Sequence, residues 1–200
     1  MYLDVTPMQT PDIQRKPYNS KFQFVLRAFF PYWRNANVTM SDVVGLTPMF
    51  HFPINYGNTY FENPLLHEFG RRTDSYFTNI TNRGNVPAPF IVMFIAKTAL
   101  KNPKITMVDT GEFLRIHKDM QAGERIVIDL TKQVLEVSQL LDGAETDAIN
   151  YFDINSSVTM SLKAGDNLIR YDADENRGGL DVKIIHHDTW AGAFGNDKTI

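Results

Sequence analysis

The sequence contains no cysteine among its 200 residues. Disulfide bonds and zinc sites built from thiolates are therefore excluded. Long apolar runs are also missing, because the longest one, Phe90–Ala96, is far below the roughly 20 residues that a transmembrane helix needs. The first residues lack the basic-then-apolar layout of a signal peptide. We therefore expect a soluble chain without membrane insertion.

Neither sign of charge dominates the chain. It has 20 Lys and Arg against 23 Asp and Glu, which gives a net charge of -3. A balance this close to neutral predicts no general attraction to nucleic acid or to an anionic membrane. Hydrophobic residues make up 43% and charged residues 22%, as in ordinary globular proteins. The length suffices for a core in one large or two small domains.

Catalytic signatures are absent: no Gly-X-Ser-X-Gly elbow, P-loop or dinucleotide fingerprint occurs. The densest histidine cluster is His186-His187-Asp188. Neighbours on a strand point to opposite faces, so these two imidazoles cannot easily share one metal ion. The other histidines lack His-X-His or His-Glu-X-X-His spacing: His51, His67 and His117. We interpret the histidines as solvated or packing residues and expect no metal site.

Carboxylates are too common for a glycosidase pair to be excluded by counting. Four of them lie in predicted turns: Glu112, Asp119, Glu124 and Asp129. Side-chain oxygens at such positions cap backbone N–H groups, which explains them without catalysis. We expect no enzyme activity, no catalytic residue and no cofactor.

Short apolar runs separated by turn signals fill the region from Asn82 to Val137. The signals include Asp109-Thr110-Gly111 and Gln121-Ala122-Gly123, in which glycine supplies a positive φ and Asp bonds the local backbone. Strands recurring about every ten residues indicate an antiparallel sandwich or barrel. The expected strands are Phe90–Ala96, Ile105–Val108, Phe113–Ile116, Ile126–Ile128 and Val134–Val137.

The same pattern returns near the C-terminus, where it predicts strands at Val158–Leu162, Leu168–Tyr171 and Leu180–His186. The pair Gly178-Gly179 predicts a hairpin turn before the last of them. Only Ser138–Asp153 interrupts the rhythm, with a turn at Asp142-Gly143 and one expected short helix. One half-buried face describes these strands best.

The N-terminal third is less regular. Phe22, Phe24 and Leu26 alternate with less apolar neighbours, which predicts a strand over Lys21–Phe30. Before it, Met1–Lys16 contains a short expected strand, Tyr2–Val5, and then a polar stretch punctuated by prolines.

Further along, Pro64–Gly70 is expected to form one or two helical turns, with Pro64 near the start and Gly70 as the stop. Asp74–Thr81 then predicts a strand. It leads into Asn82–Pro89, whose Gly84 and two prolines make it the best domain boundary in the chain.

Aromatic and methionine side chains crowd into the N-terminal third. Two readings fit them: a loop that covers the core, or a subunit contact, since aromatics and Met are enriched at interface cores. A loop-rich segment has little room to bury them within one subunit, so we expect an apolar patch that contacts protein. The candidate interface residues are Phe30, Tyr32, Trp33, Met49, Phe50, Phe52 and Trp190.

The order of several short motifs from Asn82 to Trp190 resembles the siphophage distal tail protein family. These motifs are Asn82-Arg83-Gly84-Asn85 before Pro-X-Pro, Asn102-Pro103-Lys104-Ile105-Thr106, Thr110-Gly111-Glu112, Ala122-Gly123-Glu124 with Ile128-Asp129, and Leu162-Lys163-Ala164-Gly165-Asp166-Asn167-Leu168-Ile169. Weaker likeness extends upstream through Phe30-Pro31-Tyr32-Trp33 and Pro48–Pro53.

The resemblance implies a mainly β protein with two parts. Residues 1–81 would be a partial, ring-forming belt domain with little helix, and residues 82–200 a galectin-like antiparallel β-sandwich. It implies a structural hub at the virion tail tip, made in the host cytoplasm. The hub would join the tail tube protein to tail-tip proteins and to receptor-binding or baseplate proteins. The family forms homo-hexameric rings; the belt here is short, so a monomer is the alternative.

A second hypothesis is a carbohydrate-binding, galectin-like module used in host-surface adhesion. Galectin-type sites stack a Trp on the sugar beside His, Asn and Arg on one sheet face. The strands from Phe113 to Val137 carry no such cluster, and Trp190 lies beyond the last expected strand. Fold analogy alone does not transfer sugar binding. The structural hub is therefore the favoured hypothesis.

Overall fold

The computed structural model describes residues 1–15, 17–43, 46–48, 70–72 and 76–192. Regular structure in these residues is almost entirely β-strand. Helix is limited to two 3-10 turns, η1 (Ile149–Tyr151) and η2 (Arg177–Gly179). The expected mainly β fold is therefore confirmed. No helix in these ranges is long and apolar enough to cross a membrane.

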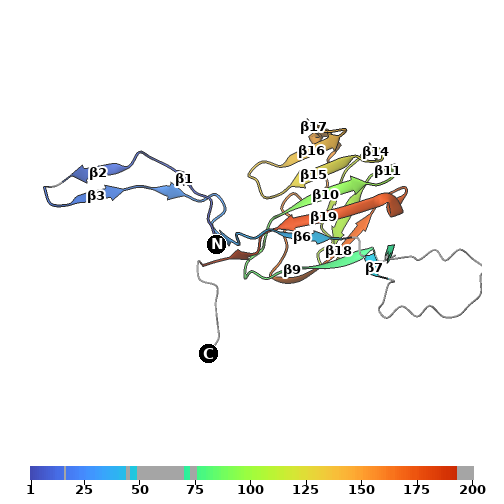
Figure 1. The fold of residues 1–200 in the computed structure, drawn as a ribbon, viewed down its shortest axis with the longest axis horizontal. Helices are drawn as coiled ribbons and strands as arrows, with labels where there is room; N and C mark the ends of the chain where they lie inside the picture. Colours follow the sequence, from blue (N-terminus) through green and yellow to red (C-terminus); the bar gives the residue numbers. More distant parts are fainter. Residues whose placement is uncertain (16, 44–45, 49–69, 73–75, 193–200) are drawn as a thin grey trace, which may run out of the picture.

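The larger of two main sheets has six antiparallel strands in the order β17-β16-β15-β10-β19-β6 (Figure 1). Their bounds, in that order, are Ala144–Asp147, Glu136–Leu141, Arg125–Asp129, Phe90–Ala96, Leu180–His186 and Thr39–Asp42. β10 lies inside the sheet, with β15 and β19 on its two sides.

The second main sheet has four antiparallel strands in the order β13-β12-β18-β9. Their bounds are Phe113–Arg115, Lys104–Met107, Gly165–Asp172 and Phe77–Asn82. Two further short pairs join β11 (Leu100–Lys101) to β14 (Asp119–Met120), and β7 (Leu46–Pro48) to β8 (Gly70–Arg72).

The two sheets pack into a sandwich because the strands alternate between a buried and a partly exposed face. In β10, Phe90, Val92, Phe94 and Ala96 are fully buried, while the residues between them are not. β19 repeats this pattern, with Leu180, Val182, Ile184 and His186 buried. The buried side chains of both sheets form one hydrophobic cluster.

Most predicted strands of this region are present within one or two residues at each end. The expected interruption at Ser138–Asp153 is a hairpin of β16 and β17 followed by η1. Asp142 and Gly143 both have positive φ, as a two-residue hairpin loop requires. The turn is therefore confirmed, and the expected helix is a single 3-10 turn.

Two C-terminal predictions are wrong. Val158–Leu162 is not a strand: only Leu162 forms a bridge, to Ala88. Gly178-Gly179 is not a hairpin turn, since it belongs to η2 and connects β18 to β19, which lie in different sheets. A glycine pair marks a change of chain direction, but it does not specify which sheet the chain enters next.

The N-terminal predictions are partly wrong. Lys21–Phe30 is broken into two short strands, β3 (Ser20–Gln23) and β4 (Leu26–Arg27). The polar stretch before it is not irregular, because it supplies their partners, β1 (Thr6–Pro7) and β2 (Asp12–Arg15). In place of the expected strand at Tyr2–Val5, Tyr2 forms a single bridge to Arg34.

Strands from both sides of the expected boundary at Asn82 enter the sandwich. β6 and β9 precede the boundary in sequence, yet β6 pairs with β19 and β9 pairs with β18. The division into residues 1–81 and 82–200 remains a prediction. The helical prediction at Pro64–Gly70 falls outside the described residues except for Gly70, which begins β8.

The packing of the core between the two sheets can be tested by measuring stability. Phe94→Ala should lower the free energy of unfolding by about 3–5 kcal/mol, because it leaves a cavity between the two sheets. Urea denaturation followed by circular dichroism measures this change. The control is Val134→Ala: Val134 is 74% exposed, so its change should stay within about 0.5 kcal/mol. Equal effects of the two variants would contradict the described core.

Candidate functional site

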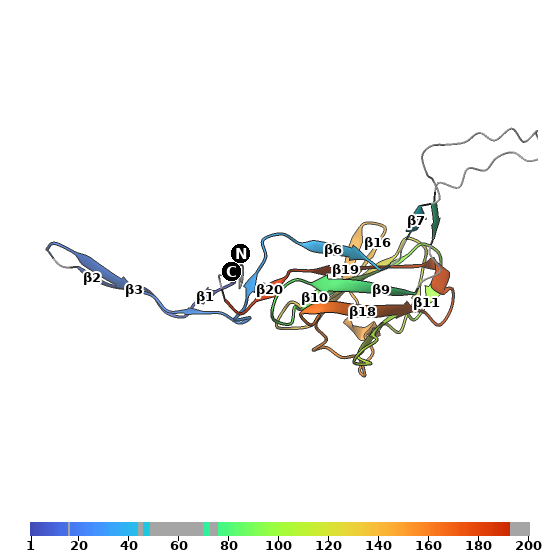
Figure 2. The same cartoon turned by 90° about the horizontal axis from the view of Figure 1, so that it is seen from below.

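A narrow two-stranded ribbon, called the arm here (residues 6–27), projects from one end of the sandwich. β1 pairs with β4, and β2 pairs with β3. Figures 1 and 2, related by a quarter turn, both show the arm pointing away from the sheets. An isolated two-stranded ribbon is at best marginally stable in water. The arm is therefore the element of this fold that most needs a partner.

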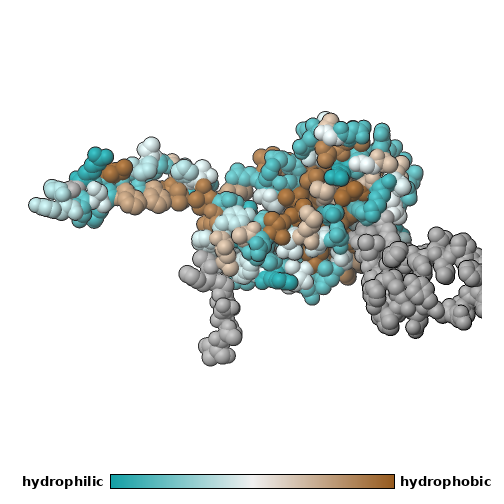
Figure 3. Space-filling model, in the orientation of Figure 1, coloured by the Kyte–Doolittle hydropathy of each residue, from teal (hydrophilic) through white to brown (hydrophobic). Residues whose placement is uncertain are grey.

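One side of the arm is apolar. Ile13 lies opposite Phe22 in the β2–β3 register, and the Phe22 and Phe24 rings stack with their centroids 6.1 Å apart. Leu26 continues this side toward the sandwich. We call these four residues the arm face; they are 57%, 69%, 50% and 46% exposed in chain order. Figure 3 shows brown and tan side chains along one edge of the arm.

The other side of the arm is polar toward the tip. It carries Asp12, Gln14, Lys21 and Gln23, which alternate with the residues of the arm face. The arm is thus an amphipathic ribbon without a core to cover its apolar side. Sequence reasoning found the alternation at Phe22–Leu26, but it missed both the partner strand and the exposure.

The arm is attached to the sandwich through a second small pair of strands. β5 (Trp33–Arg34) pairs with β20 (Thr189–Trp190), and Trp33 lies opposite Trp190. Tyr2 and Arg34 exchange two backbone hydrogen bonds of 2.9 Å. The residues that flank the arm on both sides therefore meet at β5, which pairs with β20. We call this place the arm base.

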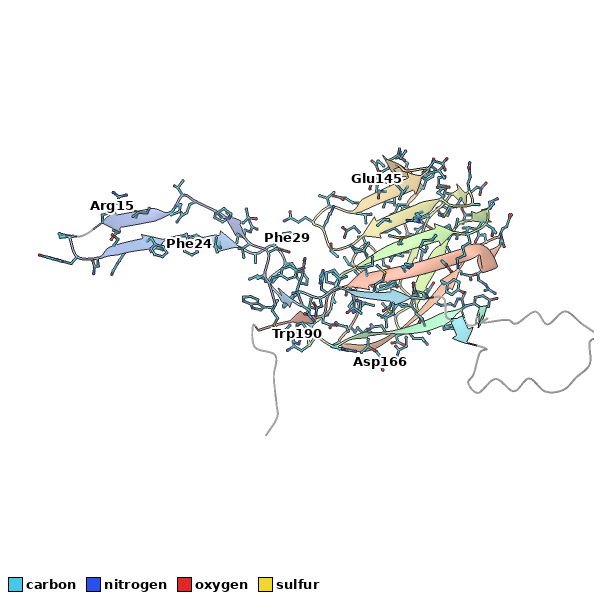
Figure 4. All side chains as sticks on the ribbon, in the orientation of Figure 1. Arg15, Phe24, Phe29, Glu145, Asp166 and Trp190 are labelled. Atoms are coloured by element: carbon cyan, nitrogen blue, oxygen red, sulfur yellow. The ribbon has the colours of Figure 1, made fainter. Side chains whose placement is uncertain are left out.

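Four of the predicted interface residues meet at the arm base. The rings of Phe30 and Tyr32 pack edge to face at 5.2 Å, and the Arg34 guanidinium lies 4.8 Å from the Phe30 ring centroid. With Trp33 and Trp190 they are half-buried. Figure 4 shows Phe29 and Trp190 where the arm joins the sandwich. Met49, Phe50 and Phe52 lie outside the described residues.

The turn from Asn82 to Val86, called the junction turn here, holds the arm base against the sandwich. Thr189 accepts a 2.9 Å hydrogen bond from the Asn85 backbone N–H, and its hydroxyl donates to the Val86 carbonyl at 3.0 Å. The fully buried Asn82 amide donates to the Val86 carbonyl at 2.9 Å and accepts from the Gly84 N–H at 3.0 Å. The turn is thereby held from both sides.

The histidine cluster joins this attachment. His187 Nδ1 lies 2.9 Å from the Asn35 carbonyl oxygen, which can only accept, so Nδ1 carries the proton. Its Nε2 lies 3.3 Å from the Tyr2 hydroxyl. Asp188 accepts from the Arg83 N–H at 2.9 Å. These contacts connect the start and end of the arm to the junction turn.

His186 points the other way, into the core, and its side chain is fully buried. Burial lowers the pKa of His186 below its ordinary 6.5, because the charged imidazolium loses its hydration. The Asp188 carboxylate, with Oδ1 3.6 Å from Nε2, opposes this shift but does not reverse it. His186 is therefore a neutral buried residue beside the arm base.

Within the described part of the chain, no group of three or more His, Asp and Glu side chains is placed to hold a metal ion. His117 Nε2 instead lies 3.0 Å from Asp153 Oδ2.

The four carboxylates that were predicted to cap turns differ in their hydrogen-bond partners. Glu124 accepts from the Gln121 N–H at 2.9 Å, and Asp129 from the Thr131 N–H at 2.8 Å, as expected for caps. Glu112 accepts from the Thr110 hydroxyl, and Asp119 lies in β14. Sequence reasoning missed that Glu124 is fully buried, with Oε1 2.9 Å from Lys118 Nζ.

The junction turn generates a second test. A β-carbon at Gly84 would overlap the backbone of Thr189, which cannot move without breaking the arm base. Gly84→Ala should therefore destabilise the fold by at least about 1–3 kcal/mol in urea denaturation. Gly178→Ala is the matched control, since a β-carbon there meets nothing within 4 Å. A neutral Gly84→Ala variant would contradict the close approach.

A third test concerns pH. Because the folded pKa of His186 is lowered, the unfolded chain binds a proton first on acidification, so its contribution is complete above pH 6.5 and declines below it. His186→Gln should flatten the fall in urea midpoint as the pH drops below 6.5. The hydrogen bond from the Asn155 N–H lowers the pKa of Asp153. The stability that Asp153 contributes is therefore lost only in more acidic solution, as the pH falls below 3.8. An unchanged slope in the variant would contradict this assignment.

The sandwich region matches a known protein family. The family model of the siphovirus-type tail component, C-terminal domain, matches residues 83–190, more than half of the chain. A search of curated protein sequences finds no match.

Among solved structures, the chain is similar to the SPP1 Dit (gp 19.1) protein, described as a paradigm of the hub adsorption apparatus in phages that infect Gram-positive bacteria. The identity is 11% and the TM-score 0.57, over 92% of this chain and 58% of that one. At this identity the likeness shows the fold, and this chain spans little more than half of that protein's length. With the family match over the sandwich, the chain belongs to the siphovirus-type tail component family.

Proposed function

We propose that this tail component is a ring-forming hub at the tail tip of the virion. In this proposal it joins the tail tube protein to tail-tip proteins and to receptor-binding or baseplate proteins. Family membership supports a structural role in the tail. The hub role, which is described for the similar SPP1 Dit protein, is extended to this chain as part of the proposal.

The arm is the structural feature that best supports the proposed ring. Its face exposes two Phe, one Ile and one Leu that are each 46–69% exposed on a ribbon held clear of the sandwich. Full burial of such a side chain is worth about 1.5–3 kcal/mol, so leaving four of them in water is costly. Apolar patches of this kind mark protein contacts in soluble proteins.

A contact between the arm and a different surface of another copy is heterologous, and it closes into a ring when the rotation fits. The family resemblance sets the proposed number at six copies. In this assembly residues 1–81 form the ring-forming part, and residues 82–200, together with β6 and β9, supply the sandwich. Phe30, Tyr32, Trp33 and Trp190 form the arm base, and Met49, Phe50 and Phe52 remain proposed contact residues.

The partners in the tail are proposed to bind the sandwich, away from the arm. β17 and β6 are the two edge strands of the six-stranded sheet, and β17 is exposed along its whole length. Glu145, on β17, lies at the edge of the sandwich that is farthest from β9 and β18 in Figure 4. This leaves the sandwich edge accessible in an assembly held together by the arm.

The ring proposal predicts the mass of the native particle. Light scattering should give a mass near six copies of the 22.9 kDa chain. Replacing Phe22 and Phe24 with Ser should reduce it to a single chain, because the arm face loses its largest apolar side chains. The circular dichroism spectrum should persist, since the arm lies outside the core.

The matched control replaces Lys21 and Gln23 with Ser on the polar side of the same strand, and its particle should keep the wild-type mass. A wild-type chain that stays monomeric at every concentration would contradict the ring. A Phe22 and Phe24 variant that still assembles would contradict the arm as its contact.

A further inference from the structure

A groove of about 310 Å³ opens beside the arm base, and four segments of the chain line it. We call it the base groove. Phe29, Phe30 and Tyr32 form one wall, and Pro87 and Pro89 lie next to them. The remaining walls are the Leu130–Lys132 loop and the Val158–Ser161 segment. The wrongly predicted strand at Val158–Leu162 thus supplies one wall of the groove.

The base groove is suited to an apolar guest. Phe29 and Val158 on its walls are 62% and 52% exposed, so apolar surface remains in contact with water. Its one charged lining residue, Lys132, is paired with Glu136 and lies 3.9 Å from Asp129. The groove therefore offers no unpaired charge to a guest, and an apolar side chain would displace water from its walls.

The arm of the same copy cannot fill this groove. Leu26 pairs with Pro7 inside the arm, whereas Phe29, three residues later, already forms the groove wall. Three residues of extended chain span only about 10 Å, too little for the arm to reverse and return. Figures 1 and 2 show the arm leaving the arm base in the opposite direction from the sheets. An arm that fills this groove must therefore come from another copy.

We propose that the arm face of one copy docks in the base groove of the next copy. One chain then carries both an apolar ridge without a core (Ile13, Phe22, Phe24 and Leu26) and an apolar groove that the described residues leave open. The two surfaces are different, so the contact is heterologous and each copy both donates an arm and accepts one. This inference rests on the proposed ring and names the surfaces that form it.

The position of the groove also explains why the arm base is held so firmly. The groove wall at Phe29–Tyr32 begins shortly after the arm ends, and Pro87 and Pro89, which directly follow the junction turn, also line the groove. The hydrogen bonds from this turn to Thr189 fix the two walls relative to each other. The donated arm and the accepting groove are therefore held in one fixed relation, which sets the rotation between successive copies.

The absence of cysteine makes a direct test possible, since any introduced thiol is unique. A Phe22→Cys chain is mixed with a Val158→Cys chain, left to exchange, and treated with a short bis-maleimide cross-linker. The expected result is a mixed dimer, identified by mass spectrometry of the linked peptides. Replacing Phe22→Cys by Gln23→Cys moves the thiol to the polar side of the arm, and the mixed dimer should be lost.

Several results would overturn the inference, and they separate it from the ring itself. A particle of ring mass without Phe22–Val158 cross-links would leave the ring in place but assign its contact elsewhere. Equal cross-linking of the Phe22 and Gln23 chains would show random collision. A cross-link within one doubly substituted chain would show that the arm returns to its own groove. A cross-link that appears only after removal of residues 193–200 would assign the groove to the C-terminus.

A monomer at every concentration would instead overturn the proposed ring, and the docking with it. The mass measurement on the wild-type chain is therefore made first, and the cross-linking is read against it.

Discussion

The junction turn passes so close to the backbone of Thr189 that only glycine fits at position 84. This approach lets Asn85, Val86 and Thr189 form hydrogen bonds, which hold β20 beside the sandwich. β20 in turn pairs with β5, the strand that follows the arm in the sequence. The direction of the arm thus depends on one backbone contact between residues about one hundred positions apart in sequence.

The molecule combines a well-packed body with an element that has no core of its own. The sandwich buries its apolar residues in a single cluster, whereas the arm leaves its apolar face in water. These two features fit the proposed ring, in which the contacts that stabilise the arm would belong to another subunit. In the proposed assembly the rigid body would present its edges to other tail proteins while the arm connects the copies.

Local pattern failed where the deciding contact was distant. Asp12 and Gln14 are polar residues in a strand, because that strand exists only as the partner of the apolar one opposite it. Val158 has the apolar character of a strand residue, but it lies in a turn and lines the groove. Four of the aromatic residues predicted to form a contact, Phe30, Tyr32, Trp33 and Trp190, gather at the arm base, while the exposed apolar face lies further out on the arm.

Most strands and turns of the sandwich could be predicted from local pattern, because side-chain alternation and residues suited to positive φ act within a few positions. Phe90–Ala96 and the Asp142-Gly143 turn are of this kind. Three features became known only from the folded structure: β6 pairs with β19, β9 pairs with β18, and η2 joins two sheets. The exposure of the arm face, and the groove near the arm base, were likewise seen only in the folded structure. These features depend on which distant surfaces are complementary, and a local period carries no information about distant partners.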